Sequence, residues 1–548
     1  MMSDALSTLI RAVIVDWVAH HFSGGGHNRV GDSRPPRLKP WATRRIVLAV
    51  ATCLPMVPRL MADPWPHYAG DTPRTGTALR ATRDLSTVRW SVAPQTDEEY
   101  VWHSSPVAWG GRVFVNVRYY VNNVQAGNRV IAYAVNDGQR LWATPIDSDE
   151  LDSWSSPAID VRNQTLLLGS GYHLFALDMA TGEIAWQCQL ERRVVNASPV
   201  VTCDLFAGET PANRAFITDY NGFGDDAQLY AVNVDPYDPQ DNAYDPGEIV
   251  WTALLPGASG NTPAYQDGAV YVTSVGGVVK ALDARDGLVI WETDVDFAGY
   301  PQYSGFYGGI AVRQGHAFAA SYVYYGTGNN SGLFKFDVTD GRIVWVAPCE
   351  RTESIPVVTG EGRIYLAAGL DGYGSAIKIQ AFQDQGDTVT ELWDTYVDTG
   401  GDLIVGGWTY QPAYSRGYLY AGTPYDEESQ FFLPYTDLYI LDTARAPSDP
   451  DFVVAHYSGT GGSSAIADGT VYSFGLEGLL AFDPSPACLA DLDGDGSVSL
   501  SDLATLLGAY GSASGDADFD SDADLNRDGT IDLSDLATLL GTYGAECL

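Results

Sequence analysis

Short segments in which apolar and polar residues alternate recur along most of the chain, and many of them end in tryptophan. The clearest are LFALDMATGEIAW, VKALDARDGLVIW and LFKFDVTDGRIVW, which end at Trp186, Trp291 and Trp345. Alternation with a period of two predicts strands, and Asp followed closely by Gly between two such runs predicts a tight turn. Each segment is therefore expected to form a β-hairpin.

Weaker copies of this hairpin extend the series. Three of them end at Trp142, Trp251 and Trp393, whereas LYILDTARAPSDPDFVV has lost its Trp, with Phe452 and Val453 near that place. A second element follows each hairpin, as in SSPAIDVRNQTLLLGSG and NTPAYQDGAVYVT, and it adds two more strands. A repeat of roughly 40–65 residues with four strands is the composition of a propeller blade.

The two ends of the repeat array complement each other. The last copy, LLAFDPSP from Leu479, stops before its Trp strand, and TVRWSVAP, with Trp90, is a Trp strand without its hairpin partner. Pairing them would complete one blade from both ends and would leave the ring without a free edge. We therefore predict an all-β, eight-bladed β-propeller, or one of seven blades if the copy without Trp is a distorted insertion.

Two acidic loops with the same spacing, DLDGDGSVSLSD and DLNRDGTIDLSD, lie 33 residues apart near the end of the chain. Oxygen ligands at loop positions one, three, five, seven, nine and twelve, with Gly at position six for the sharp turn, are typical of a calcium loop. The predicted ligands are Asp491, Asp493, Asp495, the Ser497 carbonyl, Ser499 and Asp502 in the first loop, and Asp524, Asn526, Asp528, the Thr530 carbonyl, Asp532 and Asp535 in the second. The pattern predicts two calcium ions.

An apolar face with helical spacing follows each loop, in LSDLATLLGAYG and LSDLATLLGTYG. Gly508 and Gly541 are expected to end these helices. The segments that precede the two loops are unsuited to helices, so each loop is expected to have only its exiting helix. Thirteen acidic residues against Arg527 alone in residues 488–548 should keep this module unfolded without calcium.

The net charge of the chain argues against one class of partner. With 69 acidic and 31 basic residues, the formal net charge is −38, which would repel phosphate backbones and argues against nucleic acid.

Lys39, Arg44 and Arg45 precede an apolar run over 46–57 that is too short for an ordinary membrane helix. We predict a leader region over 1–62 with a signal peptide at about 39–62; an uncleaved anchor and a chance apolar stretch are the alternatives. The mature protein would then be secreted, at the cell surface or exposed to the periplasm, without a membrane span.

The cysteines fit an oxidising compartment. Cys488 and Cys547 bracket the C-terminal module, and a disulfide between them would stabilise it by about 4 kcal/mol on the chain-entropy model. Cys188 and Cys203 could pair across neighbouring strands and leave Cys349 unpaired. Free thiols at these positions are the alternative.

The Trp-ending repeats resemble those of the pyrroloquinoline-quinone-like propellers over about residues 65–486, and WPHYAGDTPRTG resembles the lead-in segment of many members. The resemblance implies the fold. The family includes quinoprotein alcohol dehydrogenases and a lipoprotein of the outer-membrane β-barrel assembly machinery. A Trp in every blade cannot stack on one quinone, so we interpret these residues as fillers between blades.

Known chemistry is hard to assign to the propeller. No two cysteines are adjacent and no Cys-x-x-Cys-His haem motif occurs, which argues against pyrroloquinoline quinone as a cofactor. The His-Glu-x-x-His and Gly-x-Ser-x-Gly motifs are also missing, and the sequence nominates no catalytic residues. The aromatic loops 299–309 and 407–414 would be either stacking faces for sugars or ordinary strand packing.

The C-terminal module, residues 488–548, resembles a type I dockerin with tandem half EF-hands, which implies a cohesin-like protein partner. Leu500-Ser501 and Leu533-Ser534, at loop positions ten and eleven, depart from the polar pairs of that family. We predict a propeller over 63–487 that acts as an exported, non-catalytic binding or scaffold domain for a carbohydrate or protein ligand, held in an extracellular assembly by its dockerin. The alternative is a carbohydrate-active component of polysaccharide breakdown; a quinone-dependent dehydrogenase is less favoured.

Overall fold

The computed structural model describes residues 64–545, except residues 148–152, 209, 221–225, 258–259, 298–303, 324–329, 371–374, 425–434, 484–488, 494–496, 514–515, 517–518, 521–522 and 527–528. The chain divides into Met1–Arg59 and Leu60–Leu548, and only the second unit is described. The expected leader therefore lies outside the described residues. Within them, no helix combines the length and the apolar character needed to cross a membrane.

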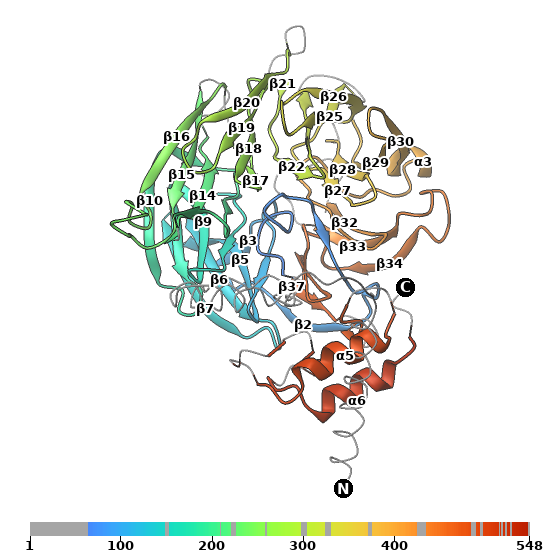
Figure 1. The fold of residues 1–548 in the computed structure, drawn as a ribbon. Helices are drawn as coiled ribbons and strands as arrows, with labels where there is room; N and C mark the ends of the chain where they lie inside the picture. Colours follow the sequence, from blue (N-terminus) through green and yellow to red (C-terminus); the bar gives the residue numbers. More distant parts are fainter. Residues whose placement is uncertain are drawn as a thin grey trace, which may run out of the picture. The chain divides into compact units, whose positions relative to one another are not determined.

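Eight four-stranded blades surround a common axis, as the repeats predict (Figure 1). The first four consist of β4 (Val107–Trp109), β5 (Arg112–Val121), β6 (Val124–Ala134) and β7 (Arg140–Asp147); β8 (Ala158–Asp160), β9 (Thr165–Asp178) and β10 (Ile184–Val194); β11 (Val200–Val201), β14 (Arg214–Thr218), β15 (Ala227–Asn233) and β16 (Ile249–Leu255); and β17 (Ala264–Gln266), β18 (Ala269–Thr273), β19 (Val278–Asp283) and β20 (Val289–Asp294). In the second blade the first part of β9 pairs with β8 and the second part with β10, so β9 fills both central positions.

The remaining blades repeat this order. They consist of β22 (Ile310–Arg313), β23 (His316–Ala320), β25 (Ser331–Asp337) and β26 (Ile343–Cys349); β27 (Val357–Val358), β28 (Arg363–Ala368), β29 (Lys378–Asp384) and β30 (Val389–Asp394); β31 (Ala413–Ser415), β32 (Tyr418–Pro424), β33 (Tyr435–Asp442) and β34 (Val453–Ser458); and β35 (Ala465–Ala467), β36 (Thr470–Gly475), β37 (Gly478–Phe482) and β2 (Val88–Val92). Short additions are β1 (Thr77–Ala78), β3 (Glu98–Tyr100), β12 (Phe206–Ala207), β13 (Thr210–Pro211), β21 (Ser304–Gly305), β24 (Tyr322–Val323) and the helix α3 (Thr395–Thr399).

Burial explains the two kinds of strand in each blade. Inner strands such as β18 and β36 are buried along their whole length, because neighbouring blades cover both of their faces. Outermost strands such as β20 and β34 carry exposed residues on one side, because solvent lies there. The alternation recognised in the sequence therefore belongs mainly to the outer strands.

The motif tryptophans lie between blades, as predicted. The Nε1 of Trp90 donates to the Val135 carbonyl of the first blade at 2.7 Å, and that of Trp291 donates to the Val338 carbonyl of the fifth at 2.7 Å. The ring of Trp291 also covers Gly341, the turn glycine of the next hairpin, where an added Cβ would lie 2.4 Å from the ring. Gly341 has a φ of 72°, so it is needed both for the turn and for the tryptophan above it.

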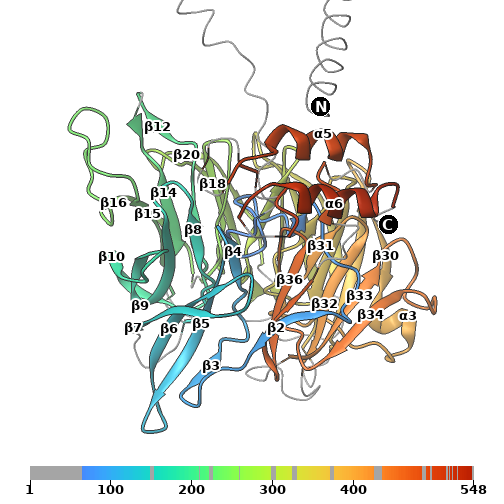
Figure 2. The same ribbon diagram turned by 90° about the horizontal axis from the view of Figure 1, so that it is seen from below.

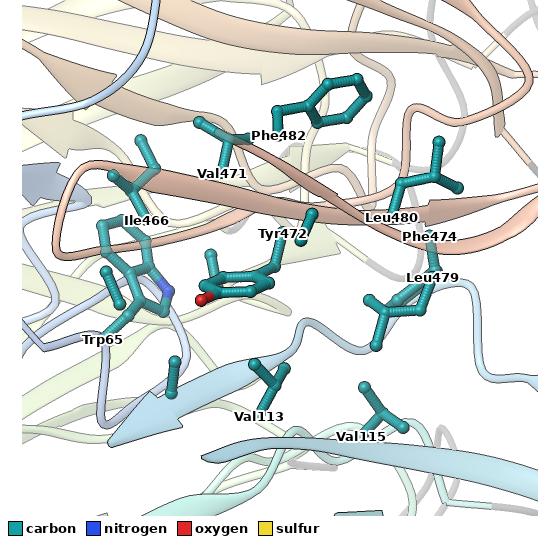
Figure 3. Packing of buried hydrophobic residues seen from close by; sticks show 14 of the residues in the cluster. Trp65, Val113, Val115, Ile466, Val471, Tyr472, Phe474, Leu479, Leu480 and Phe482 are labelled. Atoms are coloured by element: carbon teal, nitrogen blue, oxygen red, sulfur yellow. The ribbon is translucent and has the colours of Figure 1, made fainter. Parts of the chain in front are cut away.

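The last blade is completed by strand β2, which confirms the predicted closure. β2 pairs antiparallel with β37, Trp90 faces Ala481 across the ladder, and Arg89 forms an ion pair with Asp483. Side chains of this blade, including Tyr472 and Phe474, pack in one apolar cluster with Val113 and Val115 of the first blade (Figure 3). The ring therefore has eight blades and no unpaired outer edge at its seam.

Residues 65–82 form a strap that touches the inner strand region of every blade in turn. Its backbone accepts hydrogen bonds in ring order at 2.8–3.0 Å, namely from Ile159 to Pro66, Tyr265 to Thr72, Val312 to Pro73, Val358 to Thr75 and Tyr414 to Gly76. Trp65 bonds to Ala108, the imidazole of His67 accepts from Val201 N–H, and Thr82 N–H donates to Gly469, which adds the first, third and eighth blades. The strap satisfies backbone groups that would otherwise be left unpaired at the axis.

The C-terminal module contains two helices with matching surroundings, α5 (Leu500–Ala509) and α6 (Leu533–Thr542), which lie side by side (Figure 2). Val498 exchanges backbone hydrogen bonds with Gly544 and Ala545, and Ile531 exchanges them with Gly511 and Ser512, all at 2.8–2.9 Å. Each loop is thus paired with the end of the other helix, which is a local twofold relation.

Two details of the module differ from the sequence expectation. The helices run through Gly508 and Gly541 and end before Gly511 and Gly544, whose φ values of 90° and 81° reverse the chain. Gly508 and Gly541 have open space where a side chain would be, so nothing forces a stop there. Leu489, just before the first loop, is helical, and residues 484–488 lie outside the described part.

The predicted pairing of Cys188 with Cys203 is wrong, because both are free thiols, as is Cys349. Cys188 lies on β10, the outermost strand of the second blade, whereas Cys203 follows β11, the innermost strand of the third. Burial raises the pKa of the Cys188 thiol to about 11. Cys488 and Cys547 lie outside the described residues, so the disulfide between them stays a prediction.

Candidate functional site

The first acidic loop gathers carboxylates, as its spacing predicts. Carboxylate oxygens of Asp491, Asp493 and Asp502 lie within 4.8 Å of one another, and Asp491 and Asp502 are buried. Asp502 at loop position twelve accepts backbone hydrogen bonds from Asp493 at 3.0 Å and from Ser499 at 2.6 Å. Asp491 also accepts from Arg416 of the propeller at 2.7 Å. Asp495 lies outside the described residues.

The second loop has the same backbone arrangement. Asp535 accepts from Asn526 N–H at 3.1 Å and from Asp532 N–H at 2.9 Å, and Asp524 accepts from Gly529 N–H at 2.8 Å. Asp528 lies outside the described residues. The position-nine residues, Ser499 and Asp532, act as N-caps of α5 and α6, each forming a capping box with the position-twelve Asp.

The donor set fits calcium. Three carboxylates around one point, two of them buried, repel one another unless a cation lies between them, and hard oxygen ligands suit Ca²⁺. A carboxylate has about four lone-pair sites, so Asp502 and Asp535 can accept their backbone hydrogen bonds and still bind a metal. Asp491, Asp493 and Asp502, and by analogy Asp524, Asn526 and Asp535, would hold the ions and so fix each loop against its helix.

Each helix of the module presents the same apolar residues to solvent. Leu500, Leu507 and Tyr510 of the first copy are 68%, 53% and 45% exposed, and Leu533, Leu540 and Tyr543 of the second are 68%, 53% and 49% exposed. Leu506 and Leu539 are instead buried between the two helices. The sequence periodicity grouped Leu506, Leu507 and Tyr510 on one apolar face, and likewise Leu539, Leu540 and Tyr543, but packing divides each group into a core part and an exposed part.

A second candidate site lies on the propeller axis. Its walls include one residue from each of seven blades. Six of them lie three positions before the proline that directly precedes the inner strand, and the seventh lies three positions before Ile310, where β22 begins. These residues are His103, Trp154, Asn196, Gly260, Tyr307, Glu353 and Thr409. Tyr68 of the strap also lines the cavity, which encloses about 410 Å³ of space, part of it open to solvent.

The residues directly before those prolines hold the ring together. Ser105 N–H donates to the Ser156 hydroxyl at 2.8 Å, Ser156 N–H to the Ser198 hydroxyl at 2.9 Å, and Ser198 N–H to the Thr262 hydroxyl at 3.1 Å. Each bond runs from one blade to the next. The repeated Ser/Thr-Pro therefore has a structural role, whereas the residue two positions earlier varies from blade to blade and faces the cavity.

Two titratable groups in the cavity are perturbed by burial. Burial raises the pKa of the Glu353 carboxyl to about 8. Burial, assisted by the charge of Arg118, lowers the pKa of His103 to about 3, so its imidazole is neutral at pH 7. The His103 ring lies against that of Trp154, with 4.1 Å between the ring centroids.

The cavity does not fit an anionic quinone. Its described lining includes the carboxyl of Glu353 and neither Lys nor Arg, so it offers no counter-ion to carboxylate groups of a cofactor. Arg74 lies nearby, fully buried, but its guanidinium donates to the carbonyl oxygens of Tyr68, Ser198, Pro199 and Pro263. Of the aromatic loops, Trp408 and Tyr410 are buried in packing and Tyr307 reaches the cavity.

The second recurring element of each repeat contains a sequence signal for this cavity. Aligning the second recurring element of each repeat on its Ser/Thr-Pro places His103, Trp154, Asn196 and Glu353 in one column. The side chain at this position differs from blade to blade, whereas the neighbouring positions repeat. Such a variable position indicates where the blades can together form a binding site.

Comparisons with known proteins agree with this architecture. The family model described as outer membrane protein assembly factor BamB matches residues 86–222, 222–300 and 276–444, and the EF-hand model matches residues 489–507 and 521–540. Tetrathionate hydrolase of Acidithiobacillus ferrooxidans is 26% identical over 46% of this chain and 47% of its own length. BamB of Salmonella typhimurium is 25% identical over 38% of this chain and 65% of its own length. The chain thus matches less than two thirds of either relative.

A solved structure with the same fold is the quinohemoprotein alcohol dehydrogenase of Comamonas testosteroni. It covers 75% of this chain and 76% of its own, with a TM-score of 0.51 and 12% identity. At that identity the likeness concerns the fold alone.

Proposed function

Because the chain belongs to the family of outer membrane protein assembly factor BamB, we propose that it is an exported, non-catalytic propeller held in an extracellular assembly by a calcium-dependent dockerin. In this proposal residues 63–487 are the binding or scaffold domain and residues 488–548 are the attachment module. Two calcium ions, one in each loop, would fold the module, and a cohesin-like domain would be its partner.

The observation that carries this proposal is the duplicated apolar surface of the module. The exposed trio Leu500, Leu507 and Tyr510 recurs 33 residues later as Leu533, Leu540 and Tyr543 on a helix with the same cap and the same loop. Exposed leucines and tyrosines in a set favour protein contact over solvation. The duplication offers a partner two equivalent faces, which suits attachment better than calcium sensing.

Binding to purified cohesin domains tests the proposal. We expect one member of a cohesin panel to bind the full chain in calcium and to dissociate in excess EGTA. Leu507→Asp or Leu540→Asp alone should leave binding within a few-fold, because the other face remains, and the double variant should lose at least about 100-fold in affinity. Leu141→Asp, at an exposed Leu of the propeller, is the matched control. Binding that persists in EGTA, or in the double variant, would contradict the proposal.

A further inference from the structure

The axial cavity has the chemistry of a binding site that is independent of the C-terminal module. We propose that it binds a small organic ammonium ion, with Glu353 as the counter-ion. Three observations support this assignment: the charge of the lining, the buried acceptor atoms of residues that line the cavity, and its aromatic walls.

The charge of the lining selects a cation. Glu353 lines the cavity, and among the described residues it forms no ion pair with Lys, Arg or His. Arg74, the buried cation beside the cavity, instead donates to four backbone carbonyl oxygens. A carboxyl that is enclosed without a counter-ion destabilises the fold once it ionises, and a bound cation would remove that cost.

Acceptor atoms at the same cavity provide for the N–H groups of such a cation. His103 Nδ1 and Asn196 Oδ1 are buried atoms that have no hydrogen-bond partner in the described part of the chain. His103 is more than nine-tenths buried, and its neutral ring can present one unprotonated nitrogen as an acceptor. Buried polar atoms are normally paired, so two unpaired acceptors beside one carboxyl indicate a missing donor.

The aromatic walls favour an organic cation over a bare metal ion. Tyr68, Trp154 and Tyr307 line the cavity together with Glu353. Aromatic faces attract ammonium groups and also contact attached carbon atoms. The cavity is partly open to solvent, so an ammonium group can lie beside Glu353 while the carbon chain attached to it extends toward the opening.

Proton release accompanies this binding. The pKa of Glu353 is about 8 in the free protein because the carboxyl is buried, so the group is mostly protonated at pH 7. An ammonium ion beside it favours the carboxylate, and binding at pH 7 should release close to one proton for each ligand bound.

Calorimetric titration of the full chain with n-butylammonium, in saturating calcium, tests the proposal. We expect one molecule to bind per chain, at least about 10-fold more tightly than 1-butanol or butyrate of the same size. Repeating the titration at pH 7 in buffers of different ionisation enthalpy should show the proton release. Glu353→Gln should weaken binding at least 10-fold and remove the proton release.

Glu361→Gln is the matched control, because Glu361 lies in the same blade, is exposed and is outside the cavity. It should bind n-butylammonium like the parent. Equal affinity for the alcohol, unchanged binding in Glu353→Gln, or binding of Ca²⁺ alone at this cavity would overturn the proposal. Near-ultraviolet circular dichroism checks that Glu353→Gln is folded, and none of these outcomes depends on the cohesin experiment.

Discussion

The propeller and the C-terminal module solve the problem of stability in opposite ways. Every blade of the propeller is packed between two neighbours, and its clusters of buried apolar residues follow one another around the ring. The module has one small cluster and surrounds it with carboxylates. Apolar burial needs no ligand, whereas buried like charges need a cation, so the module and not the propeller is expected to depend on calcium.

Removing calcium should separate the two regions most sharply. In excess EGTA we expect the module to unfold and become sensitive to protease, while the propeller keeps its near-ultraviolet circular dichroism. An ion bound at a thousand times its Kd contributes about 4 kcal/mol, and two loops would double that. Asp491→Ala with Asp524→Ala should reproduce the effect in calcium. Loss of the propeller signal in EGTA would show that the regions are not independent.

Trp90→Ala should destabilise the propeller and leave the C-terminal module unaffected. Trp90 fills the space between the last and first blades and donates its Nε1 to Val135, so truncation should cost about 3–5 kcal/mol of propeller stability. Thermal unfolding should register the loss without any change in the calcium response of the module. Leu141→Ala, at an exposed side chain of the first blade, is the control and should change stability by less than about 0.5 kcal/mol.

Glu353 should make the stability of the propeller depend on pH. Its pKa is raised from the ordinary 4.5 to about 8, so the folded state gains protons relative to the unfolded state between these values. This contribution to stability is present below pH 4.5 and is lost as pH rises toward 8. The free energy of unfolding of Glu353→Gln should therefore equal that of the parent near pH 4.5 and exceed it at pH 8 by about 2 kcal/mol. This value is smaller than the full pKa shift would give, because the carboxyl is partly exposed to solvent. The melting temperatures of Glu353→Gln and the parent, measured at both pH values, provide the check. If the two proteins differ by the same amount at pH 4.5 and at pH 8, ionisation of Glu353 does not cause the pH dependence.

Two glycines of the module offer the finest comparison. Gly508 lies inside α5 with open space around it, so Gly508→Ala should stabilise the calcium-loaded module by up to about 1 kcal/mol. Gly511 has a φ of 90°, so Gly511→Ala should destabilise it by about 1 kcal/mol. Urea denaturation in calcium measures both. Effects of the same sign would place the end of the helix elsewhere.

Local patterns predicted most of the fold, because each hairpin and each loop is encoded within a few adjacent residues. The Trp strands, the seam at Trp90 and the spacing of Asp491 and Asp502 were all recognisable in this way. The helix ends were wrong because Gly508 and Gly511 are both glycines, and only backbone geometry distinguishes them. The pairing of Cys188 with Cys203 was wrong because nearness along the chain does not mean nearness between opposite edges of adjacent blades.

The axial cavity required information that no single segment contains. Glu353 meets His103 and Trp154 only after the ring has formed, since these residues belong to blades far apart in the chain. The path of the strap is equally non-local, because residues 65–82 bond to blades along the whole propeller. The repeats predict the propeller fold. Which residues meet at its axis is determined only by the closed ring, so no single repeat contains that information.

The seam of the ring also sets the order in which the protein can fold. Arg89 and Asp483, which pair across the last blade, are 394 residues apart in the sequence. Bringing such distant residues together carries a high loop-closure entropy, and non-local pairing slows folding. Strand β37 would therefore present an open edge until the first and last blades meet, and the C-terminal module follows this strand within a few residues. A chain that emerges from a membrane N-terminus first can complete its ring only after almost all of the propeller has crossed, so the step most exposed to aggregation should be the last one.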